Sequence, residues 1–556
     1  MSNTRARHCL LAITLIVAFA AGCAQRTLQD PPRMMREYRA AWVTTATNID
    51  WPSQRMLSKD EQIQEIEQIL NRAEELKLNV LIVQVRSAAN RLYASSLPHA
   101  EPWARAISPT GKQGVDPGYD PLKEWVDRAH AHGIELHAWV NPFRANGATK
   151  YPTTVPLGKE GWFNPGEPDV KQWNRQIIQE LLTPTTQDFV DADIDGIAYD
   201  HYFYTDPDDD GDGTTRPAAP VTTSRPTGSV WDKHDESTYN QHNNGRESWE
   251  DFRRRQIDEF IQDTHNLIDN SDKPWVKFGI SPMAIFDPGH LHDGHKDQYD
   301  KNYANPKKWL NAGWCDYVVP ELYWTLNNPK WGFKKYLDFW LSENQTHRHV
   351  VAGMRTTKIP WPWEAPNGWT AKEIVDQIKA TRKTKAVGGA HFSMRVLDQN
   401  RGGICDLLMS EVYSEPALVP PITWKSPTTA VNAPANPTYA RLTREQMQAA
   451  MRKVANNLES TPKTKPVLIK PFYALKSPPP IAPTGGVRIN LRPAKGQKVW
   501  LWAVYARQGD KWVKQIVSGS KTEAIIPEGD NRTDEVAVSV VNRYGVESPF
   551  AKIGVR

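Results

Sequence analysis

The chain has 556 residues, enough for two or more domains, and its formal net charge is only +4. Acidic and basic residues are nearly balanced, so the composition gives no sign of the extended basic surface with which proteins bind nucleic acid. The count of 22 tryptophans is high for core packing alone, because each buried indole needs a partner for its N–H group. Sugars stack their apolar faces on such rings, so the composition favours a carbohydrate cleft.

Residues 1–22 are predicted to be a secretory signal. A basic start, the apolar stretch 10–21 and small residues before Cys23 make this pattern. A cysteine in that place resembles a bacterial lipobox, so we expect Cys23 to carry lipid; an ordinary signal with a chance cysteine is the alternative. Residue 24, directly after the cysteine, is Ala and not Asp. By analogy with the sorting of bacterial lipoproteins, this predicts attachment to the periplasmic face of the outer membrane. No later segment approaches the roughly 20 apolar residues that span a bilayer.

A polar linker is expected over 23–35. Of the remaining cysteines, Cys9 lies in the predicted signal, which leaves Cys315 and Cys405. An oxidising compartment would permit a disulfide between these two. Their spacing excludes a zinc site built from cysteines.

From residue 36 strand and helix patterns alternate eight times. Helices are predicted to start after Ser58 and at Asp120, both residue types that cap helices. The predicted strands are 39–45, 79–86, 134–141, 196–199, 276–282, 316–323, 349–354 and 387–393. Eight such units predict an α/β protein with a (β/α)8 TIM barrel over 36–415. A doubly wound sheet is less favoured, because no glycine-rich phosphate motif follows the first strand.

The rest of the chain changes character. Residues 416–480 are rich in proline and predict a linker that contains one helix, at 442–458. Residues 481–556 contain short strand patterns separated by turns, and 540–548 resembles the last hairpin of a fibronectin type III-like sandwich. A spacer is the simplest role for this all-β domain, and binding to the wall or to a partner is the alternative.

The acidic residues divide by their position relative to the strands. Reactive groups of a (β/α)8 barrel sit at the C-terminal strand ends. Asp195 and Asp316 precede their strands and are expected at the other, structural rim. Asp200 and Glu321 follow their strands, so they are the predicted catalytic pair.

Glycoside hydrolysis needs one protonated and one ionised carboxyl. Glu321 lies among apolar and aromatic residues, which favours the general acid, while Asp200 beside His201 favours the base or nucleophile. Alternatively, one of the two only binds a sugar hydroxyl or an arginine, or the acid is Asp50 or lies in the long insertion that follows Tyr204.

The same rim is predicted to bind the substrate. Its candidate residues are Asp50, Trp51, Gln84, Arg86, Asn141, Arg144, His201, Tyr202, Ser281, Tyr323 and Trp324. His391 also lies at the C-terminal end of a predicted strand and is a further candidate at this rim. His137 lies in the middle of a strand and either points into the barrel or is a core histidine.

No cofactor and no metal are predicted. The acidic run 206–213 is similar to a calcium loop but lacks the closing glutamate. His290, His292 and His295 have a spacing that could hold a metal, although a polar loop is the favoured interpretation.

Residues 36–415 resemble a bacterial family of glycosyl-hydrolase-like lipoproteins, which includes a peptidoglycan glycosidase of the division site. The motifs are RAAWV (39–43), NIDWPS (48–53), QVR (84–86), DPGYDP (116–121), HAWVNPFR (137–144), DGIAYDHYFY (195–204), FGISP (278–282) and DYVVPELYW (316–324). The resemblance implies hydrolysis of peptidoglycan glycan, including strands stripped of peptides. It also implies division or cell-wall proteins as partners.

Two positions depart from the family's pattern, which has a second Asp in place of His201 and Gln in place of Glu321. Glu321 is therefore either an added acid or only a binding residue. A catalytically inactive barrel that binds wall glycan and a metallohydrolase that uses the histidine loop are the rival functions. The sequence leaves retention or inversion of the anomeric centre open.

Overall fold

The computed structural model describes part of the chain. The described residues are 28–97, 101–145, 161–183, 193–204, 235–243, 247–285, 298–360, 368–425, 430–459 and 483–555. The predicted signal with Cys23, the acidic run 206–213 and the histidines of 290–295 lie outside these ranges. Among the described residues, no helix is long and apolar enough to cross a membrane.

Eight parallel strands close into a barrel in chain order, and β9 pairs with β2 to complete the ring. They are β2 (Tyr38–Val43), β3 (Val80–Arg86), β4 (Glu135–Val140), β5 (Gly196–Asp200), β6 (Lys277–Ser281), β7 (Tyr317–Val318), β8 (His349–Met354) and β9 (Gly388–His391). The predicted fold class, a TIM-like barrel, is confirmed.

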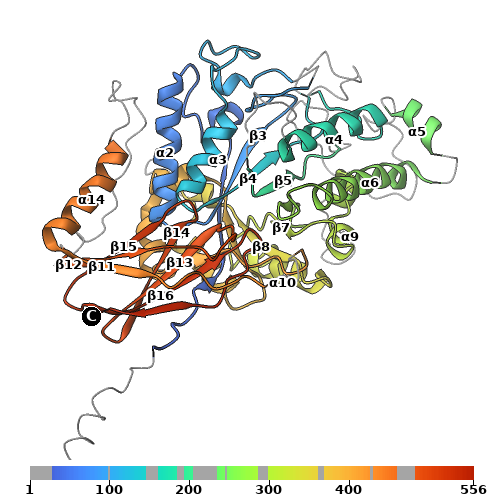
Figure 1. Ribbon diagram of the computed structural model, residues 1–556. Helices are drawn as coiled ribbons and strands as arrows, with labels where there is room; N and C mark the ends of the chain where they lie inside the picture. Colours follow the sequence, from blue (N-terminus) through green and yellow to red (C-terminus); the bar gives the residue numbers. More distant parts are fainter. Residues whose placement is uncertain are drawn as a thin grey trace, which may run out of the picture.

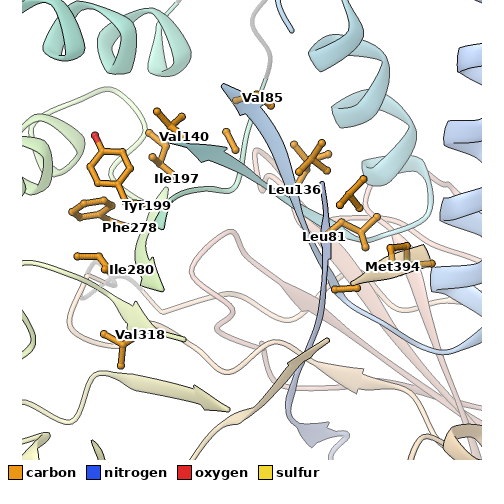
Figure 2. Packing of buried hydrophobic residues seen from close by; sticks show 14 of the residues in the cluster. Leu81, Val85, Leu136, Val140, Ile197, Tyr199, Phe278, Ile280, Val318 and Met394 are labelled. Carbon is orange, nitrogen blue, oxygen red and sulfur yellow. The ribbon is translucent and has the colours of Figure 1, made fainter. Parts of the chain in front are cut away.

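Helices surround the ring (Figure 1). They include α2 (Lys59–Glu75), α3 (Pro121–Ala131), α4 (Pro168–Leu182), α5 (Glu236–His242), α6 (Trp249–Asp269), α8 (Gln298–Lys301), α9 (Pro306–Asn311), α10 (Phe333–Glu343), α11 (Ala371–Thr381), α12 (Met394–Asp398) and α13 (Ile404–Leu407). Ser58 and Glu61 form a reciprocal capping box that fixes the start of α2. Figure 2 shows part of the apolar layer between strands and helices, with Leu81, Leu136 and Ile197 on neighbouring strands.

The barrel interior is filled by the alternate residues of each strand, which form a second buried cluster. Near its base, Lys277 lies 2.8 Å from a carboxylate oxygen of Glu135. His137 Nδ1 lies 2.7 Å from the hydroxyl of Tyr317. His137 thus points into the barrel and also has polar partners, so it is a core histidine.

A β-sandwich follows the barrel. One sheet has the order β11 (Thr438–Thr443), β12 (Gly485–Asn490), β15 (Glu523–Glu528). The other has the order β14 (Lys511–Ser518), β13 (Leu501–Gln508), β16 (Thr533–Val541), β17 (Ala551–Gly554), and α14 (Arg444–Glu459) follows β11. This is the strand order of a fibronectin type III-like sandwich. Its first strand, β11, lies in the stretch predicted as linker, and it carries little buried apolar surface.

The sandwich packs against the barrel rim formed by the N-terminal strand ends (Figure 1). Arg543 lies 2.9 Å from a carboxylate oxygen of Asp195 and 2.7 Å from one of Asp193. The ring centroids of Trp500 and His130 are 4.6 Å apart. Asp195 therefore belongs to the structural rim, as its position in the sequence predicts.

The segment before the barrel is fixed along the sandwich. Met34 N donates to the Tyr505 hydroxyl at 3.2 Å, and Lys552 donates to the carbonyl of Leu28 at 3.1 Å. β1 (Met35–Arg36) then pairs with β10 (Ala417–Leu418). The chain enters the barrel from its structural rim.

Cys315 and Cys405 are both buried free thiols. Burial raises the pKa of each thiol. The disulfide considered for this pair is absent from the structure.

Candidate active site

Three polar side chains meet at the C-terminal rim of the barrel. Asp200 ends β5 and His201 follows it, while Glu321 forms parallel bridges to Met283, just beyond β6, and to Gly353 near the end of β8. His201 Nδ1 lies 2.8 Å from Asp200 Oδ1 and 3.5 Å from Glu321 Oε1. The side chains of Asp200, His201 and Glu321 are 10%, 13% and 22% exposed. The structure thus brings the predicted catalytic pair together around one imidazole.

His201 carries a proton at neutral pH. Burial by itself lowers the pKa of His201, but the Asp200 and Glu321 carboxylates outweigh it and raise this pKa to about 10. The contact to Asp200 is an ion pair without hydrogen-bond alignment, and the backbone N–H of His201 donates to Asp200 Oδ1 at 2.8 Å. The imidazolium thus lies beside both carboxyl groups of the predicted catalytic pair.

The surroundings of Glu321 differ from the apolar setting expected from the sequence. Its neighbour Leu322 is completely buried in the core, and so takes the apolar side of this short segment. Glu321 itself faces the cation of His201.

The same three side chains could hold a metal, since one ligand atom from each lies within 4.8 Å of the others. A metal would have to replace the proton of His201, because an imidazolium has no free lone pair for a ligand bond. These three side chains can therefore act as acid and base groups in their present protonation state. They can bind a metal only after His201 is deprotonated.

Aromatic rings and arginines flank this centre. The Tyr202 ring lies 4.4 Å from that of His201, and Arg144 lies over the rings of Tyr202, at 4.8 Å, and Trp162, at 5.7 Å. Tyr202 is only partly buried, so its ring offers this rim a flat apolar surface of the kind on which sugars stack, whereas Trp162 is buried.

Tyr323 lies on the other side of the centre. Burial, followed by the negative charges of Glu321 and Asp200, raises the pKa of Tyr323 well above its ordinary value. Its ring centroid is 6.1 Å from that of Phe392, and the guanidinium carbon of Arg355 lies 5.7 Å from the Tyr323 ring. Farther along the same loop, Trp324 stacks with Trp331 at 6.0 Å.

Other predicted substrate-binding residues lie in the supporting structure. Trp51 is completely buried, its indole N–H donates to Gln62 O at 3.1 Å, and its ring packs edge-on against Trp125. Arg86 is also completely buried and forms two hydrogen bonds to Glu101, at 2.7 and 2.5 Å. These contacts assign Trp51 and Arg86 to packing in place of sugar binding.

Asp50, Gln84, Asn141 and Ser281 hold the loops of the rim. Asp50 accepts hydrogen bonds from Thr44 N, Ser393 Oγ and Arg395 N at 2.7, 2.6 and 2.8 Å. Gln84 Oε1 accepts hydrogen bonds from Thr45 N and Ala46 N. Asn141 Nδ2 donates a hydrogen bond to Ser87 O. Ser281 Oγ donates one to Val319 O. All four side chains are buried, so they position the loops and do not contact a ligand from solvent.

Two further residues have structural roles. Asp316 pairs with Lys425 at 2.8 Å and accepts from the Trp424 indole at 2.7 Å, on the sandwich side of the barrel. His391 is completely buried beside Thr356, and burial lowers the pKa of His391 to about 4.

Arg355, Trp162 and Phe392 were missed by the sequence reasoning. For Arg355 a signal was present, because this residue directly follows the predicted strand 349–354 and so obeys the rule that selected Asp200. Trp162 is distant in sequence from every strand end, and only its contact with Arg144 places it here.

Three known proteins are similar to this chain. The chain is 31% identical over 440 residues to glycosyl hydrolase YngK of Bacillus subtilis, which covers 74% of this chain and 78% of the relative. It is 24% identical over 415 residues to glycosyl hydrolase DigH of Escherichia coli, covering 66% and 87%. The glycoside hydrolase domain of PgaB (BpsB) from Bordetella bronchiseptica superimposes with a TM-score of 0.42 at 11% identity, over 67% of this chain and 98% of that domain. The family model described as glycosyl hydrolase-like 10 matches residues 37–371, and the chain therefore belongs to the glycosyl hydrolase-like 10 family.

Proposed function

We propose that the chain hydrolyses glycosidic bonds in the glycan strands of peptidoglycan, with Asp200 and Glu321 as catalytic residues. The observation that carries the proposal is the pair of carboxylates on either side of His201, at the reactive rim of the barrel and among aromatic rings. The choice of peptidoglycan is supported by the predicted export signal and by the family resemblance of the sequence motifs. On the same grounds we propose a lipid anchor at Cys23 and the periplasmic face of the outer membrane.

Glu321 is the proposed proton donor because it is the more exposed of the two carboxyls. A proton that moves from His201 Nδ1 to Glu321 Oε1 makes Glu321 an acid without changing the net charge of the centre. Glu321 then gives this proton to the glycosidic oxygen as the bond to the anomeric carbon breaks.

Asp200 is the proposed nucleophile. Carboxyls about 5 Å apart are typical of retaining glycosidases, whereas inverting enzymes keep roughly 6.5–9.5 Å for a water molecule. One oxygen of each carboxylate lies within 4.8 Å of the other here, which supports retention. Asp200 forms an ester with the anomeric carbon, and water hydrolyses this ester while Glu321 accepts the proton of the water.

Purified sacculi test the proposal. Asp200→Asn and Glu321→Gln are each expected to slow the release of soluble fragments, measured by mass spectrometry, by about 100-fold or more, the usual size of acid–base contributions. Asp510→Asn is a matched control, since Asp510 is an exposed carboxylate of the sandwich. If both cleft variants release fragments at the wild-type rate, the catalytic assignment is wrong.

The rival function is an inactive barrel that binds wall glycan. It is favoured by one observation, that the charge of His201 offsets one of the two carboxylates. Wild-type protein that binds sacculi and releases nothing would establish this function.

A further inference from the structure

Arg355 has the same strand phase as the proposed catalytic pair, so its side chain is expected on the interior-facing side of the strand end. Side chains alternate along a strand, so residues two apart point to the same side. Val351 of β8 lies in the interior cluster, and Arg355 is four residues farther on. The same phase leads from Val319 to Glu321 and from Ala198 to Asp200.

Contacts agree with this phase. The bridge between Glu321 and Gly353 puts the backbone of Glu321 beside that of β8, two residues before Arg355. The Arg355 guanidinium lies over the Tyr323 ring, and its charge acts on the Tyr323 phenol together with those of Glu321 and Asp200. The side chains of Asp200, Glu321, Tyr323 and Arg355 therefore lie in one neighbourhood of the rim.

The Arg355 guanidinium has no hydrogen bond or ion pair to any side chain in the part of the chain that the structure describes. Arginines elsewhere in the barrel are paired: Arg86 binds Glu101, and Arg382 binds Glu37. Arg355 is exposed, so its five N–H donors face solvent at the rim.

The centre itself is unfavourable for an acidic ligand. Asp200, His201 and Glu321 together carry one net negative charge while His201 is protonated. An anionic group bound next to them needs a nearby cation, and a planar guanidinium can bind a carboxylate through two parallel hydrogen bonds.

We propose that Arg355 binds a carboxylate substituent of the glycan, held beside the scissile bond with one sugar face on Tyr323. This inference rests on the proposed function, and it narrows the substrate to an acidic polysaccharide whose carboxylates are free. Amidation of the carboxylates, or peptides attached to them, removes the charge that Arg355 recognises.

The test compares soluble glycan strands freed of stem peptides with the same strands after their carboxylates have been converted to methylamides. Wild type is expected to cleave the acidic strands with a kcat/KM about tenfold higher. A tenfold effect is at the low end of what a charged hydrogen-bonded pair contributes, because Arg355 is exposed to solvent. Arg355→Gln is expected to abolish the preference by lowering kcat/KM for the acidic strands alone. Arg532→Gln removes one exposed arginine of the sandwich and is the matched control for net charge.

Binding separates this inference from the proposed function. The affinity of both strand types is measured by calorimetry in a Glu321→Gln background, which stops turnover. If wild type cleaves neither strand type but the binding preference depends on Arg355, the Arg355 site is supported and the hydrolase is overturned. Equal cleavage of both strands by wild type and Arg355→Gln, with equal affinities, overturns the Arg355 site and leaves the hydrolase standing.

Discussion

His201 and Glu321, the two positions that depart from the family's sequence pattern, contact each other in the structure. The usual pattern puts two adjacent carboxyls after β5 and an amide after β7. Here the second carboxylate lies on the β7 side, and an imidazolium takes the place it leaves. The two departures therefore lie at one place: Glu321 contacts His201 on one side, and Asp200 contacts it on the other.

The first prediction concerns His201 and pH. Its pKa of about 10 is above the ordinary value of 6.5, so its stabilising effect is complete below pH 6.5 and is lost as pH rises through 10. At about 1.4 kcal/mol for each unit of pKa, this effect is on the order of 5 kcal/mol. His201→Gln is expected to be less stable than wild type at pH 6, with the gap closing above pH 10, as measured by urea unfolding. A gap that stays constant with pH would contradict the charged state of His201.

The second prediction concerns stereochemistry. Because one oxygen of each carboxylate lies within 4.8 Å of the other, which is nearer to the spacing of retaining enzymes than to that of inverting ones, the first product is expected to keep the anomeric configuration of the substrate. Proton NMR of the reducing end during the first minutes of hydrolysis detects this. An inverted product would exclude Asp200 as a nucleophile.

Secondary-structure elements were predictable where one physical pattern dominates. The predicted strand 349–354 coincides with β8, and the helix starts predicted at Ser58 and Asp120 agree with α2 and α3 to within one residue, because a continuous apolar run marks the strand and side-chain caps mark the helices. The predicted strand 316–323 shortens to Tyr317–Val318, since Pro320 has no N–H for the ladder.

The site was predictable only in part. The strand-end rule located Asp200 and Glu321, but it could not show which neighbouring polar side chains turn back to the backbone. Asp50 and Gln84 satisfy loop N–H groups that become close only in three dimensions.

The third prediction tests the packing inside the barrel. A Cβ at Gly279 would lie 1.9 Å from the Tyr317 ring, so the ring would have to move away from His137. Gly279→Ala is expected to lower the free energy of unfolding by about 1–3 kcal/mol, as overpacking does. Gly529→Ala is the control, because nothing lies within 4 Å of the added atom. Equal stability of both variants in urea would show that the interior adapts.

At the scale of the whole molecule, the sandwich covers the barrel's structural rim. Beside Arg543 and His130, the pKa of the buried Asp195 stays well below its ordinary value even though burial opposes this. The ionised Asp195 carboxylate therefore stabilises the folded state at any pH above the ordinary pKa of an aspartate. This stabilisation is lost as the pH falls below that value. The interface is therefore expected to weaken in acid.

The fourth prediction removes this contact. Arg543→Gln leaves the Asp195 carboxylate with His130 as its main cation, so the free energy of unfolding is expected to fall by about 2–4 kcal/mol. The rate of glycan cleavage per folded molecule is expected to stay unchanged, because Arg543 lies at the opposite rim from Glu321. Arg532→Gln, again the control, is expected to change neither. A loss of cleavage at full stability would show that the sandwich acts on the cleft.

The fixed path of residues 28–36 along the sandwich determines how a tethered molecule stands. Only residues 24–27 lie between Cys23 and Leu28, a reach of about 18 Å even when fully extended. If the proposed lipid is attached to Cys23, the sandwich is expected to rest next to the bilayer, with Asp200 and Glu321 at the far end of the barrel. The sandwich and barrel would then act as a spacer of fixed height: glycan close to the lipid would stay out of reach, and strands about one molecule's length away would be presented to the proposed active site.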